Sequence, residues 1–209
     1  MRIIKSSYAI ITPIDGDVIL NRIEQCGRIC YKSEDRITDD SALKFVDSII
    51  KRGHESVLEH CAFTVKFICD RGVSHEIVRH RMASYCQEST RYCNYSKDDF
   101  DGEITVIEPF YLTPNTNAYD EWKEACGRAE RAYFNLLEWG CTPQEARAVL
   151  PNSLKTEIIM TANIREWRHF LKLRTSNAAH PQLREVAIPL LNELQNRVPI
   201  LFDDIRPES

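Results

Sequence analysis

Residues 61–69 read Cys-Ala-Phe-Thr-Val-Lys-Phe-Ile-Cys, and residues 70–83 continue as Asp-Arg-Gly-Val-Ser-His-Glu-Ile-Val-Arg-His-Arg-Met-Ala. In the first stretch Phe63, Val65 and Phe67 alternate with other side chains, which predicts a strand that carries these three residues on one face. The second stretch predicts a helix over about 73–83. A strand that runs directly into a helix is therefore the starting point for the fold.

The neighbouring segments extend this pattern in both directions. Strands are expected at 2–11, 103–108 and 155–161. Gly140 is placed to end a long helix, and the order Thr-Pro-Gln-Glu at 142–145 is typical of a helix start with a capping box. Helical spacing of apolar residues predicts helices at 17–31, 40–51, 117–139, 164–173 and 182–196.

Strands and helices follow one another without a strict strand–helix–strand rhythm. The pattern predicts an α+β fold in which mixed helices accompany a mainly antiparallel sheet. No repeat or linker interrupts the chain, so residues 1–209 are expected to form a single compact domain.

The composition is that of a globular protein, with 27 Lys and Arg against 31 Asp and Glu over 209 residues. No apolar run approaches the ~20 residues that cross a bilayer. We expect no signal peptide in the first residues, because Lys5-Ser6-Ser7 breaks their apolar part and no small-residue cleavage site follows. We expect a soluble, cytoplasmic protein.

The eight cysteines are expected to be reduced thiols, since nothing signals export. No Cys-x-x-Cys pair is present, and His54 and His60 are six residues apart, whereas a metalloprotease helix needs histidines four apart. We therefore expect no bound metal. A thiol-redox or metal role for Cys86 and Cys93 remains a weaker alternative.

Glycine-rich phosphate loops and the Gly-x-Ser-x-Gly nucleophile motif are absent from the sequence. If the protein binds phosphates, side chains must do so. The arginines gather in two clusters although the formal net charge is −4. The first comprises Arg71, Arg79, His80, Arg81 and Arg91, and the second Arg165, Arg168, His169, Lys172, Arg174 and Arg184. Local basic clusters on an acidic chain favour a small anionic ligand over nucleic acid.

Helix geometry predicts which way the side chains of the first cluster face. On a helix over 73–83, Arg79, His80 and Arg81 would fan around the axis, so at least one would face inward or into a subunit contact. Such a cation needs a carboxylate or a bound anion. The alternative is an ordinary surface helix whose arginine reaches back to water.

The second cluster divides between the faces of its helix. Ile164, Trp167, Leu171 and Arg174 share one stripe, which places Arg174 on the buried side, and Arg165, Arg168, His169 and Lys172 lie outside it. Read alone, Asn163 is a helix N-cap and Arg147 a surface arginine.

Residues 79–92 bring these observations together: Arg-His-Arg, seven further residues, then Ser-Thr-Arg. This resembles the signature of flavin-dependent thymidylate synthases. His54-Glu55-Ser56 with Glu59-His60 is similar to an upstream segment of that family. Arg147-Ala148-Val149-Leu150-Pro151 resembles its Arg-x-x-Leu-Pro element, and 161–174 resembles its C-terminal block. Order and spacing agree over about residues 20–190.

The resemblance implies a homotetramer of α+β subunits whose active sites form where subunits meet. It implies conversion of dUMP to dTMP, with methylenetetrahydrofolate as carbon donor and FAD, reduced by NADPH, as hydride carrier. Neither nucleic acid nor a membrane would be a partner. Because hydride transfer completes the chemistry, no cysteine nucleophile is implied. The alternatives are a non-catalytic relative that binds dUMP and FAD, and a nucleic-acid binder, which the sequence pI of about 5.9 disfavours.

The same resemblance assigns roles to residues. Arg174 would be catalytic and would polarise the uracil ring. Residues for dUMP would be Glu76, Arg79, Gln87, Glu88, Ser89, Thr90, Arg91, Arg147 and Arg174. Residues for FAD would be Ser56, Arg79, His80, Arg81, Gln87, Asn163, Arg165 and His169. Ser89, with arginines but no paired base nearby in the sequence, suits a phosphate- or ring-binding hydroxyl better than a nucleophile.

This chain departs from the family pattern at several of these positions. Glu76 stands where many members have Gln, and Cys86-Gln87 where many have Asn-Glu, with an acid next door at Glu88. His169 replaces a common amide, and Ala178 a common histidine, although His180 is close by. Cys30 stands where a small hydroxyl residue often contacts flavin. These exchanges concern individual contacts more than the class of enzyme.

Overall fold

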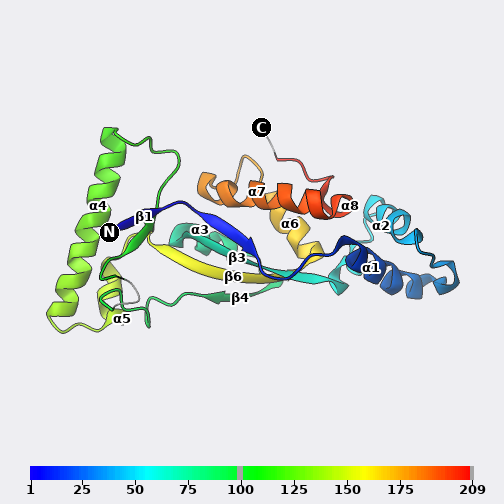
Figure 1. The fold of residues 1–209 in the computed structure, drawn as a ribbon, viewed down its shortest axis with the longest axis horizontal. Helices are drawn as coiled ribbons and strands as arrows, with labels where there is room; N and C mark the ends of the chain where they lie inside the picture. Colours follow the sequence, from blue (N-terminus) through cyan, green and yellow to red (C-terminus); the bar gives the residue numbers. More distant parts are fainter. Residues whose placement is uncertain (98–100, 208–209) are drawn as a thin grey trace. The chain divides into compact units, whose positions relative to one another are not determined.

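The computed structural model describes residues 1–97 and 101–207, and it confirms the α+β class (Figure 1). Its main sheet has four strands in the order β2-β3-β6-β4 and is mainly antiparallel. A second, two-stranded sheet pairs β1 with β5 in parallel, with Ile3 opposite Val106. Contacts divide the chain into two compact units, and all four strands of the main sheet contribute residues to both.

Unit 1 comprises residues 1–7, 67–79 and 86–159. Its core gathers around Tyr133 of the long helix α4, whose ring packs edge-on against Tyr95 at 5.6 Å. The elements that it wholly contains are β1 (Arg2–Ile4), α3 (Arg71–Ile77), β5 (Thr105–Ile107), α4 (Asn117–Glu138), α5 (Pro143–Ala146) and the 3-10 helix η4 (Arg147–Val149).

Unit 2 comprises residues 8–66, 80–85 and 160–209, of which 208–209 lie outside the described residues. It contains most of strand β2 (Ser7–Ile10) and shares β3 (Ala62–Asp70), β4 (Ala83–Gln87) and β6 (Lys155–Asn163) with unit 1. Its helices are α1 (Gly16–Tyr31), η1 (Glu34–Arg36), α2 (Ser41–Lys51), η2 (Glu55–His60), α6 (Ile164–Arg174), α7 (Pro181–Arg197) and α8 (Pro199–Phe202).

Strand β3 and helix α6 form the centre of unit 2. The predicted alternation on β3 is confirmed, because Phe63, Val65 and Phe67 are all buried. The Phe63 ring stacks on Trp167 of α6 at 4.8 Å, and the Trp167 indole N–H donates to the Phe63 carbonyl at 3.1 Å. Buried aromatic pairs of this kind add to the free energy gained from apolar burial. The sheet therefore fixes the height and direction of α6.

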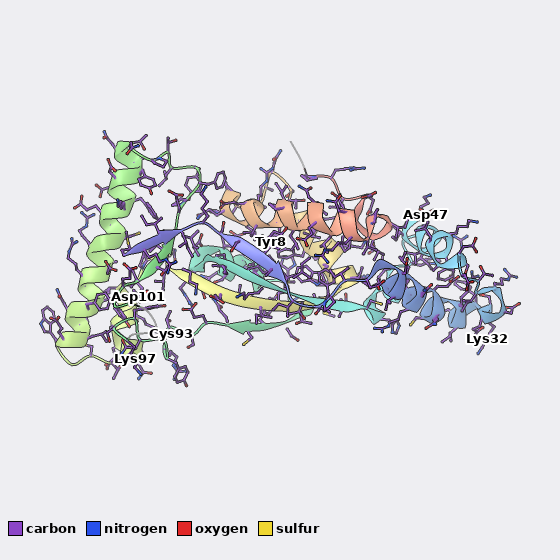
Figure 2. The ribbon with its side chains drawn as sticks, in the orientation of Figure 1. Tyr8, Lys32, Asp47, Cys93, Lys97 and Asp101 are labelled. Atoms are coloured by element: carbon purple, nitrogen blue, oxygen red, sulfur yellow. The ribbon has the colours of Figure 1, made fainter. Side chains whose placement is uncertain are left out.

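Strand β2 is attached to the last long helix through Tyr8, which Figure 2 labels. Its hydroxyl donates to the Glu193 carboxylate at 2.9 Å and lies 3.1 Å from the Pro189 carbonyl oxygen of α7. Burial and the hydrogen bond to Glu193 raise the pKa of Tyr8 to about 12. The phenol therefore stays protonated and acts as a donor at neutral pH.

The expected helix over 73–83 is wrong in its second half. Asp70 caps α3 by accepting from the Val73 N–H at 2.7 Å, and the helix ends at Ile77. A turn follows, and then strand β4 begins at Ala83. Arg79, His80 and Arg81 therefore do not fan around a helix. Of these three only His80 is buried, and a histidine, unlike an arginine, can be buried as a neutral group.

Other boundaries differ in smaller ways. The strand expected over 2–11 is broken between Ile4 and Ser7 into β1 and β2, which belong to different sheets. The expected helix stop at Gly140 is confirmed, since Gly140 has a φ of +88°, a conformation that suits glycine. The capping box at Thr142 and Glu145 is also confirmed. Helix α8 was not expected from the sequence.

Candidate functional site

The residues assigned to a site by the sequence fall into two sets, one in each unit. Unit 2 holds Ser56, His80, Arg81, Asn163, Arg165, His169 and Arg174. Unit 1 holds Glu76, Arg79, Gln87, Glu88, Ser89, Thr90, Arg91 and Arg147. The first set contains most of the residues expected to bind FAD and the second most of those expected to bind dUMP. Each set is described within its own unit.

A groove of about 400 Å³ lies beside α6 in unit 2. Three residues expected to bind flavin line it: Asn163, Arg165 and His169. The remaining lining side chains are Glu55, Glu59, Met82, Glu166, Arg168 and Lys172. Ser56, His80 and Arg81 are not among the lining residues, although exposed Ser56 lies between Glu55 and Glu59 on η2. The groove thus offers cations, carboxylates and the amide of Asn163 to one ligand.

Asn163 ends β6 and caps α6. Its side-chain oxygen accepts from the Glu166 N–H at 2.9 Å, so the expected N-cap role is confirmed. Because the cap uses the oxygen, the amide nitrogen is left as a donor on the groove wall. Capping and ligand binding are therefore compatible in this residue.

Two arginines of α6 differ in their surroundings. Arg165 is half exposed and donates to Glu59 at 2.6 Å. Arg168, expected outside the buried stripe, is only 2% exposed, which corrects that expectation. It makes two hydrogen bonds of 2.7 Å to Asp204 and also donates to the Leu201 carbonyl. Burial by itself raises the pKa of the Asp204 carboxyl, but the Arg168 hydrogen bonds and charge outweigh it and lower that pKa.

Arg174, at the end of α6, is only half-buried, and its Nε donates to Nε2 of His80 at 3.0 Å. On the other side of the imidazole, His80 Nδ1 lies 3.0 Å from the Glu166 carboxylate. Burial lowers the pKa of His80; the Glu166 carboxylate opposes this effect and the Arg174 charge adds to it. A neutral imidazole with its proton on Nδ1 satisfies both contacts, because Nδ1–H donates to Glu166 and Nε2 accepts from Arg174.

The ligand atoms of His80, Glu166 and His169 lie within 4.8 Å of one another, a spacing that a metal ion could bridge. The Arg174 contact argues against this use of His80. Its Nε2 lone pair already accepts from a guanidinium, and its Nδ1 carries the proton that Glu166 accepts. A cation here would have to displace one contact and would also lie beside the Arg174 charge. Glu166, His80 and Arg174 therefore form a hydrogen-bonded group, and His169 contacts the His80 ring edge-on at 5.6 Å.

In unit 1, Gln87 ends β4 and Glu88 follows it, and side chains or backbone of β6 and α3 bind both residues. Gln87 Nε2 donates to the hydroxyls of Ser74 and Thr156, at 2.9 and 3.2 Å. The Glu88 carboxylate accepts from Lys155 Nζ at 3.0 Å and from the Glu157 N–H at 3.2 Å. The acid at 88 is thus neutralised within unit 1, which limits its repulsion of an anion bound nearby.

The turn after β4 brings together part of the expected phosphate set. Buried Thr90 accepts from Arg147 Nη1 at 3.3 Å, and Ser89 Oγ accepts from the Arg91 N–H at 3.3 Å. Arg79, Arg91 and Arg147 are exposed, and no ion pair occupies their guanidinium groups among the residues described. Within that same part of the chain, no histidine or carboxylate accepts from Ser89, as a nucleophile would require.

Sequence reasoning missed Glu166 and the partners of Arg168. Glu166 lies three residues after the cap Asn163, a spacing typical of the first turn of a helix. That spacing does not reveal the contact with His80, which is 86 positions away. The cysteines are free thiols in the structure, and burial raises the pKa of Cys61, Cys69, Cys93 and Cys126.

An α+β chain that offers arginines and amides, with no glycine-rich loop, has the features of a protein that binds phosphorylated small molecules through side chains. Residues 18–200 match a family model described as Thymidylate synthase complementing protein. The flavin-dependent thymidylate synthase of Pyrococcus furiosus is 36% identical over 186 residues, which cover 88% of this chain and 73% of that protein.

Two further relatives are similar to the same extent. The flavin-dependent thymidylate synthase of Geobacter sulfurreducens is 35% identical over 86% of this chain and 79% of that protein. That of Mycolicibacterium vanbaalenii is 34% identical over 92% of this chain and 81% of its own length. The chain therefore belongs to the flavin-dependent thymidylate synthase family, which confirms the resemblance found in its motifs.

Proposed function

We propose that this chain catalyses the reductive methylation of dUMP to dTMP, with methylenetetrahydrofolate as carbon donor and NADPH-reduced FAD as hydride carrier. One observation carries the proposal: in a chain of this family, α6 bears Arg174, fixed by a neutral His80, and also two side chains that line a groove, Arg165 and His169.

The groove fits a flavin ring by size and by chemistry. Pockets for small molecules run from about 300 to 1,000 Å³, and this one is about 400 Å³. A flavin ring presents both donors and acceptors, which the amide of Asn163, the guanidinium of Arg165 and the imidazole of His169 can meet. The other residues proposed for FAD are Ser56, His80 and Arg81 in unit 2 and Arg79 and Gln87 in unit 1. When bound, FAD supplies the hydride that reduces the transferred carbon.

The residues after β4 are suited to the nucleotide. Arg91 and Arg147 would bind the phosphate of dUMP as charge-assisted donors, with Ser89 and Thr90 adding hydroxyls. Glu76, Arg79, Gln87 and Glu88 would complete this set, with Glu88 held in place by Lys155. Arg174 would stabilise negative charge that develops on the uracil ring, the most valuable place for a fixed cation.

We infer a supporting role for His80 and Glu166. His80 accepts from Arg174 Nε, and this contact fixes the plane of the guanidinium. Glu166 keeps the imidazole proton on Nδ1, so that Nε2 stays an acceptor. A guanidinium held in this way loses little freedom when substrate binds.

The wider setting is also proposed. We infer a homotetramer with active sites between subunits, a single domain over 1–209, a cytoplasmic location and no nucleic-acid partner. Among the described residues, no helix is both long enough and apolar enough to cross a membrane. Arg147 and Arg91 are exposed in the single chain, which is what residues that serve a neighbouring subunit's site require.

Release of tritium from [5-³H]dUMP tests the activity, in mixtures that contain FAD, NADPH and methylenetetrahydrofolate. We expect FAD-dependent release, reduced at least a hundredfold in Arg174→Ala, as for loss of a transition-state donor. Arg22→Ala, an exposed arginine outside the groove, is the matched control. If dUMP and FAD bind but no label is released, the chain is the non-catalytic relative. If neither binds, the family function itself fails.

A further inference from the structure

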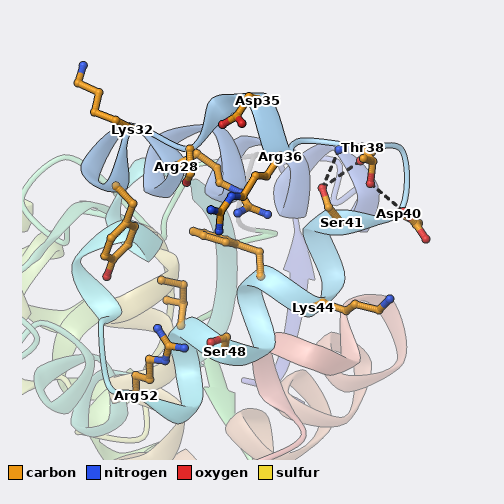
Figure 3. A pocket seen from close by; sticks show the side chains of 14 residues that line it. Arg28, Lys32, Asp35, Arg36, Thr38, Asp40, Ser41, Lys44, Ser48 and Arg52 are labelled. Carbon is orange, nitrogen blue, oxygen red and sulfur yellow. Dashed lines mark hydrogen bonds between the residues drawn. The ribbon is translucent and has the colours of Figure 1, made fainter.

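A second, larger cavity lies between α1, η1 and α2 and belongs entirely to unit 2 (Figure 3). Its volume is about 640 Å³, and it shares no residue with the groove beside α6. Side chains that can carry charge dominate its wall: Arg28, Lys32, Arg36, Lys44 and Arg52 against Asp35 and Asp40. Neither the sequence motifs nor the proposed reaction uses these residues.

Arg28 is held rigidly on one wall of this cavity. Its Nε and Nη2 donate to one oxygen of Glu24, at 3.0 and 2.7 Å. Glu24 is only 1% exposed, and its other oxygen accepts from Ser41 at 2.8 Å. The guanidinium also lies 4.7 Å above the Phe45 ring centre. A carboxylate on one edge and an aromatic face below fix the guanidinium in one orientation before any ligand arrives.

Gly27 is what lets Phe45 take this place. A Cβ atom at position 27 would lie 2.5 Å from the Phe45 ring, closer than real contacts allow. Glycine in the middle of a helix costs about 1 kcal/mol relative to alanine. At this position the missing Cβ atom leaves room for the Phe45 ring to pack against α1, beneath Arg28.

Arg36 and Arg52 have no such partners. Neither side chain forms an ion pair or hydrogen bond in the part of the chain that the structure describes. Figure 3 shows the guanidinium groups of Arg28 and Arg36 directed toward each other, with Arg52 reaching in from the end of α2. Like charges that converge repel, and an anion between them would turn this repulsion into attraction.

Neither lining carboxylate, Asp35 or Asp40, forms an ion pair with an arginine of the cavity among the residues described. Asp40 accepts from the Thr38 hydroxyl at 2.8 Å, and this bond, with the charge of Lys44, lowers its pKa. The one buried carboxylate nearby, Glu24, is already committed to Arg28 and Ser41. The cavity therefore keeps an excess of positive charge on a chain whose net charge is −4.

We propose that this cavity is a binding site for a small multivalent oxyanion, distinct from the sites of the proposed reaction. Guanidinium forks match the oxygens of phosphate and carboxylate groups, and the volume suits a small molecule rather than a single ion. Arg28 supplies the fixed donor, and Arg36 and Arg52 close on the ligand from η1 and α2.

Calorimetric titration of the full chain with pyrophosphate tests this site. The titration is run at low salt, both without other ligands and with FAD and dUMP at saturation, so that phosphate sites of the proposed reaction are filled. We expect one site that persists under both conditions. Arg36→Gln and Arg52→Gln should each weaken it about tenfold or more, as for loss of a charge-assisted hydrogen bond. Arg22→Gln, on the exposed part of α1, should not change it.

Parallel titration with citrate separates the two sources of this chemistry. Binding of pyrophosphate alone assigns the site to phosphoryl groups, and equal binding of citrate assigns it to multivalent oxyanions in general. Absence of both, or equal loss in Arg22→Gln, overturns the proposal. If neither anion binds, sedimentation of Arg36→Gln gives the reason. A change in oligomeric state would show that carboxylates of a second copy occupy the cavity. None of these outcomes depends on turnover of dUMP.

Discussion

The groove beside α6 and the cavity between α1 and α2 are both rich in arginine, but they differ in how many of these arginines form ion pairs. In the groove, Arg165 and Arg168 are paired with Glu59 and Asp204. In the cavity, Arg36 and Arg52 have no carboxylate among the residues described. An ion pair holds an arginine in one orientation and uses some of its N–H donors, whereas an arginine without a partner keeps all of its donors for a ligand. Counting arginines in a sequence cannot distinguish these roles.

The largest expected change in stability comes from removing the ion pair of Arg168. Arg168→Ala should lower the free energy of unfolding by about 3 kcal/mol, because it removes a buried side chain together with its charge-assisted hydrogen bonds. Urea unfolding followed by circular dichroism measures this. Arg165→Ala, which removes a half-exposed pair, should cost less than about 1 kcal/mol. Equal losses of unfolding free energy in the two variants would show that the buried ion pair of Arg168 stabilises the fold no more than the half-exposed pair of Arg165.

The stripe on α6 shows what the sequence could and could not reveal. The 3-4-3 spacing correctly buried Ile164, Trp167 and Leu171, because apolar periodicity is a local property. It placed Arg168 outside, since the acids that allow its burial are far along the chain, at 55 and 204. Burial of a cation depends on such tertiary partners.

The segment after α3 shows a second limit. Apolar residues at 73, 77, 78 and 82 suggested one continuous helix, but β4 begins at Ala83 because β6 provides a partner for its backbone. Short strands depend on pairing more than on their own composition. The cavity between α1 and α2 could not be predicted from the sequence either. Its arginines come from three separate segments of the chain, which only the tertiary fold brings together.

Replacing two helical glycines with alanine should change the free energy of unfolding in opposite directions. Gly27→Ala should push the Phe45 ring away, and this displacement should outweigh the gain in helix propensity, with a net loss of about 1 kcal/mol. It should also weaken pyrophosphate binding severalfold by releasing Arg28. Gly127→Ala in α4 meets its nearest atom only at 3.8 Å and should instead stabilise the chain by up to about 1 kcal/mol. Thermal unfolding of both variants measures the signs. Stabilisation in both would show that Phe45 is not held against α1.

The smallest expected effect concerns the neutral histidine that holds Arg174. Because burial lowers the pKa of His80, the unfolded chain binds a proton there more readily than the folded chain does. The contribution of His80 is therefore fully present above its unfolded pKa of about 6.5 and is lost as pH falls from there toward its lowered folded value. The slope from one group cannot exceed about 1.4 kcal/mol per pH unit.

Urea unfolding of the wild type and His80→Gln between pH 5 and 8 isolates this slope from that of the other histidines. We expect the difference between the two proteins to shrink as the pH falls, because a protonated imidazole can no longer accept from Arg174 Nε. A pH-independent difference would mean that the pKa of His80 is the same in the folded and the unfolded chain, so that neither burial nor the Arg174 charge lowers it. A difference that grows at low pH would mean that His80 is held charged by Glu166, and the tautomer assigned to the Arg174 contact would be wrong.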